Sequence, residues 1–257
     1  MKSKNSLYVN LFIGSTINVE RVAGTDVQMV QKTDYPWSGN VSITVNPKQA
    51  RPFSIFVRVP NRKTSELYAP TPEVRGLTSL AVNGKSVTPE MANGYAVLTR
   101  EWKAGDKLEL VLPMNVQRVK ADEKIAADRG LVALRYGPLL YNVERADQPD
   151  ISLALGAGPL ATEWRGDLLQ GVLTLRGKWA DGSPLVAIPN YARNNRPSQS
   201  PSQIPGGESN NPAIDYSGGA SVGTTGAGAT TNASAAGQPQ IRGRFGEAAS
   251  VVWIKGQ

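Results

Sequence analysis

Residues 7–32 read LYVNLFIGSTINVERVAGTDVQMVQK, and this stretch decides the fold class. Apolar and polar residues alternate along it and β-branched residues are frequent, which is the pattern of half-buried β-strands. Gly14 and the run Gly24-Thr25-Asp26 interrupt the alternation, as turn residues do. We therefore expect three successive strands, at residues 7–13, 16–22 and 27–32.

The same pattern continues through the next hundred residues. Asn83-Gly84 is a pair preferred in two-residue hairpin turns, in which both central residues need a positive φ. Strands at this spacing, joined by short turns rich in Gly, Asn and Pro, are typical of a β-sandwich. Besides the hairpin at residues 80–85, further strands are expected at residues 41–45, 53–59, 95–99, 107–112, 116–120, 131–136 and 139–143.

Candidate strands are sparser after residue 148. Residues 173–176, 185–189 and 251–254 qualify, whereas residues 161–169 stay unassigned. Residues 197–241 are rich in Ser, Pro, Gly, Asn, Ala and Thr, and they contain too little apolar surface to offset the entropy of ordering. We therefore predict an all-β protein with two domains. The first is an antiparallel, jelly-roll-like β-sandwich at residues 1–148, and the second is a smaller C-terminal β-domain at residues 149–257, interrupted by a disordered insertion at about 197–241.

The composition argues against several classes of protein. The 257 residues include no histidine and no cysteine, which removes disulfides, thiolate zinc ligands and the commonest general base and nucleophile. The net charge is +7, but Lys and Arg are scattered along the chain, so we expect no nucleic-acid partner. No apolar run reaches the roughly 18 residues of a membrane span, so we expect no membrane partner. The polar start at residues 1–6 is not a signal peptide and suggests an internal point of a longer protein, which leaves the compartment open.

A series of short strings, taken in order along nearly the whole chain, resembles one known family. The strings are Leu7 to Ser15, Thr33 to Gly39, Phe56 to Asn61, Val82 to Gly84, Gly94 to Trp102 with Gly105 and Asp106, Leu110 to Met114, Arg129 to Leu134, Tyr136 to Tyr141, Ile188 to Arg196 and Val252 to Ile254. Together they resemble glycoside hydrolase family 127, the β-L-arabinofuranosidase-like proteins.

This resemblance implies a larger enzyme with two parts, of which one is catalytic and the other is not. Members of the family are similar in having an N-terminal (α/α)₆ barrel followed by β-sandwich domains. The barrel binds zinc through cysteines and a glutamate, and one of those cysteines is the nucleophile of a retaining mechanism. Because this chain has no cysteine, no catalytic, cofactor-binding or metal-binding residue carries over to it. The resemblance therefore implies a non-catalytic β-sandwich portion, inactive by itself, with the catalytic barrel as its partner.

The loop Thr33-Asp34-Tyr35-Pro36-Trp37-Ser38-Gly39 offers the best candidate contact residues, Tyr35 and Trp37. Their flat rings are suited to stack on a sugar or to fill a pocket of a protein partner. A structural role, in which Trp37 closes the end of the sandwich core, stays open. If the loop makes a contact, we expect the partner to be the catalytic barrel rather than a free sugar. The remaining tryptophans are expected in the core or at its edges: Trp102, Trp164, Trp179 and Trp253.

Two other functions stay open. A stand-alone carbohydrate-binding module, with Tyr35 and Trp37 as its stacking platform, would show exposed coplanar aromatic rings beside polar side chains. A hydrolase that uses paired carboxylates would need two of them facing each other across a cleft. A broad apolar face near residues 7–13 and the Trp37 loop would instead favour the supporting role. The candidate carboxylates are Asp34, Glu101, Asp106, Glu109, Asp122, Glu123, Asp128 and Glu144.

Overall fold

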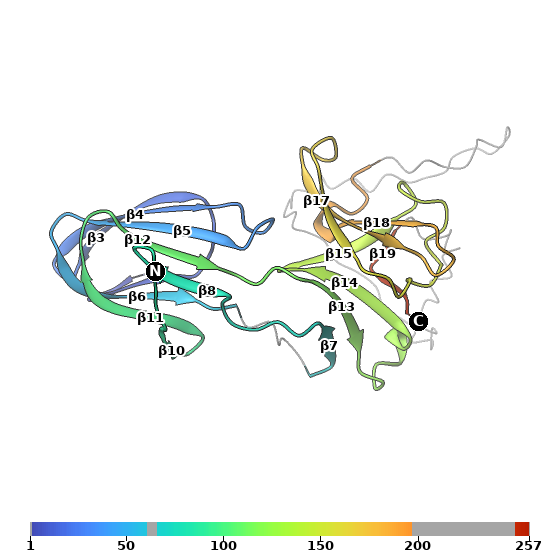
Figure 1. The fold of residues 1–257 in the computed structure, drawn as a ribbon, viewed down its shortest axis with the longest axis horizontal. Coiled ribbons are helices and arrows are strands. Elements are labelled where there is room, and N and C mark those ends of the chain that lie inside the picture. Colours follow the sequence, from blue (N-terminus) through green and yellow to red (C-terminus); the bar gives the residue numbers. More distant parts are fainter. Residues whose placement is uncertain (1, 61–65, 197–249, 257) are drawn as a thin grey trace, which may run out of the picture. The chain divides into compact units, whose positions relative to one another are not determined.

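The computed structural model describes residues 2–60, 66–196 and 250–256. Within these ranges the chain forms twenty β-strands and two three-residue 3₁₀ helices, η1 (Ala126–Asp128) and η2 (Asn190–Ala192), and no α-helix. The strands belong to three sheets (Figure 1). The predicted all-β, antiparallel sandwich class is therefore confirmed. The insertion predicted at about 197–241 lies outside the described residues.

The first two sheets share one hydrophobic core. The first sheet has the strand order β1 (Lys2–Ser3), β2 (Ser6–Val9), β6 (Arg51–Arg58), β11 (Tyr95–Trp102) and β10 (Glu90–Ala92). The second sheet has the order β3 (Ser15–Val22), β4 (Thr25–Thr33), β5 (Asn40–Pro47), β12 (Asp106–Val111), β8 (Ser79–Val82) and β9 (Lys85–Ser86). Strand β2 runs parallel to β6 in an otherwise antiparallel first sheet.

The alternation in the sequence matches the side chains that fill this core. On β5, Val41, Ile43 and Val45 are buried, while the residues between them lie on the other face of the sheet. Trp102 ends β11 and is fully buried, and its indole Nε1 donates a hydrogen bond to the Phe53 carbonyl on β6 at 3.0 Å. The indole therefore fills volume between the sheets without leaving its N–H unpaired.

The predicted hairpin turn is confirmed. Asn83 and Gly84 have φ values of 52° and 75°, and they connect β8 to β9. The side chain of Asn83 also binds the neighbouring β11–β12 turn, because its amide nitrogen donates to the Asp106 carboxylate at 2.8 Å and its oxygen accepts from the Lys107 amide at 2.7 Å. This network ties the β8–β9 hairpin turn to the β11–β12 turn, which connects the two sheets of the first sandwich.

The third sheet has a core of its own. Its strand order is β16 (Ala161–Arg165), β17 (Val172–Lys178), β18 (Pro184–Pro189), β15 (Leu139–Glu144), β14 (Leu131–Tyr136), β13 (Val116–Ala121) and β7 (Tyr68–Thr71). Two short strands complete the pairing, β19 (Ser250–Val251) on β15 and β20 (Trp253–Lys255) on β14. The domain boundary predicted at residue 148 runs through this sheet, with β13 to β15 before it and β16 to β18 after it.

Residues 7–13 form a shorter strand than predicted. Strand β2 ends at Val9, and residues 10–14 leave the sheet before β3 begins at Ser15. The apolar side chains of this connecting segment therefore do not all point into the core.

Candidate docking face and aromatic loop

The connection between β2 and β3 exposes large aliphatic side chains. Leu11 is 69 % exposed and Ile13 is 59 % exposed, and Ile17 on the adjoining strand β3 is 52 % exposed. Single exposed apolar residues are common on protein surfaces, but these three lie in one stretch and line the same cavity, so they form an apolar patch. We call Leu11, Ile13 and Ile17 the aliphatic face.

Hydrogen bonds hold the backbone of this segment in place. The buried side chain of Gln31 reaches from β4, and its Nε2 donates to the carbonyls of Leu11 at 3.1 Å and Ile13 at 2.7 Å. The Tyr95 hydroxyl donates to the Asn10 Oδ1 atom at 2.8 Å. Because the carbonyls turn inward to Gln31, Leu11 and Ile13 are presented on a fixed backbone.

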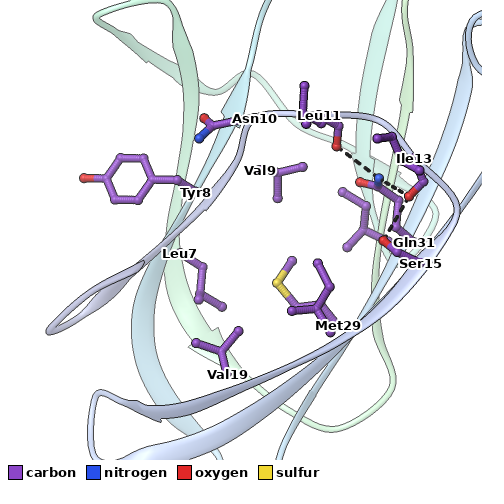
Figure 2. A pocket seen from close by; sticks show the side chains of 12 residues that line it. Leu7, Tyr8, Val9, Asn10, Leu11, Ile13, Ser15, Val19, Met29 and Gln31 are labelled. Carbon is purple, nitrogen blue, oxygen red and sulfur yellow. Dashed lines mark hydrogen bonds between the residues drawn. The ribbon is translucent and has the colours of Figure 1, made fainter. Parts of the chain in front are cut away.

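A cavity of about 400 Å³ lies beside this segment, and Figure 2 shows the side chains around it. None of the lining residues is charged, and Asn10 Oδ1, the Ser15 hydroxyl and Gln31 Nε2 already take part in internal hydrogen bonds. The cavity therefore suits aliphatic side chains and offers little to a polar ligand. Its lining consists of Leu7, Tyr8, Val9, Asn10, Leu11, Ile13, Ser15, Ile17, Val19, Met29, Gln31 and Ile43.

The two predicted contact residues, Tyr35 and Trp37, both have partners inside this chain. Tyr35 is half-buried against the first core, where its ring meets Phe12 edge-on at 5.8 Å. Trp37 is also half-buried, and its ring lies 5.7 Å from Trp164 and 6.4 Å from Tyr191, measured between ring centroids. The loop thus brings the two residues to different surroundings, and they do not form one flat platform.

The candidate carboxylates have mostly structural surroundings. Glu101, Glu109 and Glu123 each pair with a lysine or arginine close by in sequence. Asp106 belongs to the hairpin network described above, and although burial alone raises its pKa, hydrogen bonds from the Lys103 amide and the Asn83 side chain hold the pKa below its usual value. The Asp106 carboxylate therefore stabilises the β8–β9 and β11–β12 turns.

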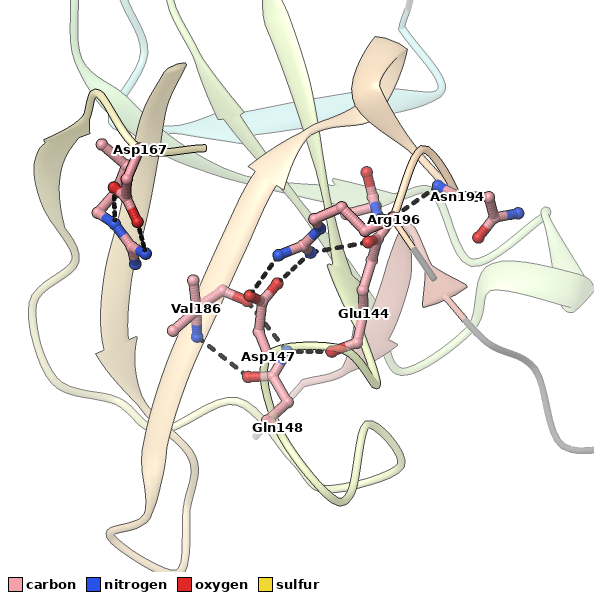
Figure 3. Close-up of polar contacts among 9 residues, drawn as sticks. Glu144, Asp147, Gln148, Asp167, Val186, Asn194 and Arg196 are labelled. Carbon is pink, nitrogen blue, oxygen red and sulfur yellow. Dashed lines mark hydrogen bonds and ion pairs between the residues drawn. The ribbon is translucent and has the colours of Figure 1, made fainter. Parts of the chain in front are cut away.

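Glu144 and a residue not among the candidates, Asp147, share one guanidinium in the third sheet. Arg196 donates to Glu144 at 2.7 Å and to Asp147 at 2.5 and 2.6 Å (Figure 3). Hydrogen bonding to Asp147, opposed by burial, raises the pKa of Arg196 above its usual value. Both carboxylates are held in ion pairs with Arg196, so they are poorly placed to serve as a general acid and a nucleophile.

The described residues contain neither a metal-binding cluster nor a membrane-spanning helix. No group of three or more His, Cys, Asp or Glu side chains there is arranged to hold a metal ion. No helix in the same part of the chain is long and apolar enough to cross a membrane.

Sequence reasoning missed the exposed aromatic residues Trp164 and Tyr191, which are 53 % and 61 % exposed. The sequence predicts Trp164 in the core or at its edge, and the structure places it, exposed, on β16, the edge strand of the third sheet. A signal was available, since Trp164 stands between Glu163 and Arg165 in a run of polar residues. A tryptophan in such a run is a poor candidate for burial.

Family comparisons agree with this architecture. The profile described as "Beta-L-arabinofuranosidase, GH127 middle domain" matches residues 6–114, and that of the "Glycoside hydrolase family 127 C-terminal domain" matches residues 116–202. A non-reducing end β-L-arabinofuranosidase of Bifidobacterium longum subsp. longum is 33 % identical over 175 residues, which make up 64 % of this chain and 24 % of that protein.

Solved structures give the same result. The family 127 β-L-arabinofuranosidase of Geobacillus stearothermophilus T6 is 30 % identical, with a TM-score of 0.66 over 77 % of this chain and 33 % of that one. A second family 127 β-arabinofuranosidase is 26 % identical, with a TM-score of 0.66 over 75 % of this chain and 33 % of that one. The chain spans a quarter to a third of these relatives. It belongs to glycoside hydrolase family 127 and matches that family's middle and C-terminal domains.

Proposed function

We propose that this chain is the non-catalytic β-sandwich portion of a family 127 glycoside hydrolase, and that it supports the catalytic portion of the enzyme. The observation that carries the proposal is the aliphatic face, in which Leu11, Ile13 and Ile17 are more than half exposed beside an apolar cavity. Covering such a surface with a partner is favourable, because removing apolar area from water contributes roughly 25 cal/mol for each Å².

The occupant that we propose is the part of the enzyme that this chain does not span. In the solved relatives this chain matches 33 % of the length, so about two thirds of each relative lies outside the match. Because Gln31 fixes the backbone at Leu11 and Ile13, little conformational entropy is lost when the face is covered. A prearranged aliphatic surface is suited to a permanent, domain-like interface.

The chemistry of the chain supports the non-catalytic part of the proposal. The zinc that the family resemblance implies would find no thiolate or imidazole ligand, because the sequence has no Cys and no His. The residues present do not fit that metal, and we assign no reaction step to this chain. The parent activity that we propose, after the relatives' names, is hydrolysis of β-L-arabinofuranosides.

A chimera tests the docking. Residues 1–257 would replace the matching third of the Geobacillus enzyme, and we expect the chimera to release arabinose. We expect L11D combined with I13D to lower the activity of the chimera at least tenfold and to lower its melting temperature, because two carboxylates would be buried without partners.

The matched control is M91D. Met91 is 57 % exposed on β10, at the edge of the first sheet opposite β1 and β2, and its substitution should leave activity and melting unchanged. An inactive parent chimera, or a double variant as active and as stable as the parent, would contradict the proposed docking.

A further inference from the structure

Three aromatic side chains from separate segments meet beside the third sheet. Trp37 comes from the loop after β4, Trp164 from the edge strand β16 and Tyr191 from η2. Trp37 contacts both of the others, with its ring plane at 74° to that of Trp164 and at 50° to that of Tyr191. The three rings form one aromatic cluster, with a half-buried ring between two exposed ones.

The local backbone makes room for Trp164. Gly171 begins the return toward β17 with a φ of +109°, and a Cβ atom placed on it would lie 2.6 Å from the Trp164 Cζ2 atom. The indole therefore lies against the turn of its own hairpin and against Trp37. Its position is fixed on two sides although 53 % of the residue is exposed.

The exposed surface of the cluster has the size of a small ligand. Trp and Tyr side chains present on the order of 200 Å² each, so the exposed parts of Trp164 and Tyr191 amount to about 230 Å². A standard protein–protein interface needs roughly 800 Å² on each partner. The exposed area of the cluster is a fraction of such an interface, and it is comparable with the face of a ligand of a few sugar rings.

The chemistry of the cluster also differs from that of the aliphatic face. Aromatic rings are flat and their electron-rich faces attract the C–H groups that one side of a sugar ring presents, while hydroxyl groups at the ring edge need polar partners. Exposed carboxylates occur in the same segments as the rings: Asp34 three residues before Trp37, and Asp167 three residues after Trp164. The aliphatic face has neither feature.

We propose that Trp164 and Tyr191, backed by Trp37, form a carbohydrate-binding site for a short neutral oligosaccharide. The inference rests on the proposed function for the identity of its ligand, because a glycoside hydrolase meets oligosaccharides. In this role the site would hold a glycan on the non-catalytic portion of the enzyme, apart from the bond that is cleaved.

Isothermal titration calorimetry of the full 257-residue chain with arabinotriose tests the site. We expect saturable binding that weakens at least tenfold in W164A and in Y191A. Because both residues are exposed, the variants should keep the circular dichroism spectrum and melting temperature of the parent.

The matched control is Y68A. Tyr68 is also an exposed tyrosine that touches a tryptophan, Trp253, but it lies on β7, at the opposite edge of the sheet from β16. Binding should be unchanged in this variant. Saturation-transfer difference spectra should place the C–H protons of the sugar against the aromatic rings in the parent and not in W164A.

Three outcomes would overturn the proposal: no binding of arabinotriose by the parent chain, equal binding by W164A and Y191A, or loss of binding in Y68A as well. The result is separable from the docking proposal. The titration uses the chain without any catalytic portion, and the docking test changes only Leu11 and Ile13. If W164A lowered the activity and stability of the chimera without any sugar binding by the chain, the cluster would be a protein contact.

Discussion

R196M is expected to lower the free energy of unfolding by about 3–5 kcal/mol, because it removes the guanidinium that forms ion pairs with two largely buried carboxylates. The side chains of Glu144 and Asp147 are 4 % and 13 % exposed. Methionine keeps much of the volume of the arginine stem, so the loss reports the uncompensated charges more than a cavity. Urea denaturation, followed by tryptophan fluorescence, measures the change.

Two comparisons make this result specific. R165M removes an arginine whose partner Asp167 is 68 % exposed, and surface pairs of that kind contribute little, so this variant should unfold at the urea concentration of the parent. Adding E144Q and D147N to R196M should recover a large part of the lost stability, since neutral amides tolerate burial better than carboxylates. If R196M lowered the free energy of unfolding less than R165M does, the ion cluster around Arg196 would have no role in stability.

The second large effect is expected at Trp102. We expect W102A to lower the free energy of unfolding by about 3–5 kcal/mol, because a fully buried indole leaves a cavity between two sheets. The truncation also leaves the carbonyl of Phe53 without the hydrogen bond from the indole. The measurement is again urea denaturation, with circular dichroism near 218 nm as the signal for strand content.

W102F serves as the companion variant. It keeps an aromatic ring and loses mainly the N–H donor, so a smaller loss of about 1–3 kcal/mol is expected. A W102A protein as stable as W102F would show that the first core closes around the missing ring. That result would contradict the role of the Trp102 indole in filling the space between the two sheets.

Local patterns in the sequence were sufficient for most of the strands. Alternation predicted β4, β5 and β12 within a few residues, and Asn83-Gly84 identified its hairpin, because both signals depend on neighbours in the chain. Strand β16 was not predicted, because four of its five residues are exposed at a sheet edge and its sequence shows no alternation of buried and exposed positions.

Long-range contacts were the part that could not be predicted. Strand β7 pairs with β13, about fifty residues later, and joins the third sheet although its neighbours in sequence belong to the sandwich. Residues 10–14 leave the strand where Gln31, some twenty residues later, binds their carbonyls. The sequence drew attention to Tyr35 and Trp37, but the aromatic partners of Trp37 lie more than one hundred residues away, so their contacts could not be predicted from neighbours in the chain.

The most direct test of the non-catalytic assignment is an assay of the purified 257-residue chain alone. It would be incubated with a β-L-arabinofuranoside and released arabinose would be quantified, with the Geobacillus enzyme as the positive control. We predict no release above the rate without protein, with or without added zinc. Turnover by the chain that a single substitution such as D34N or E144Q abolishes would contradict the account.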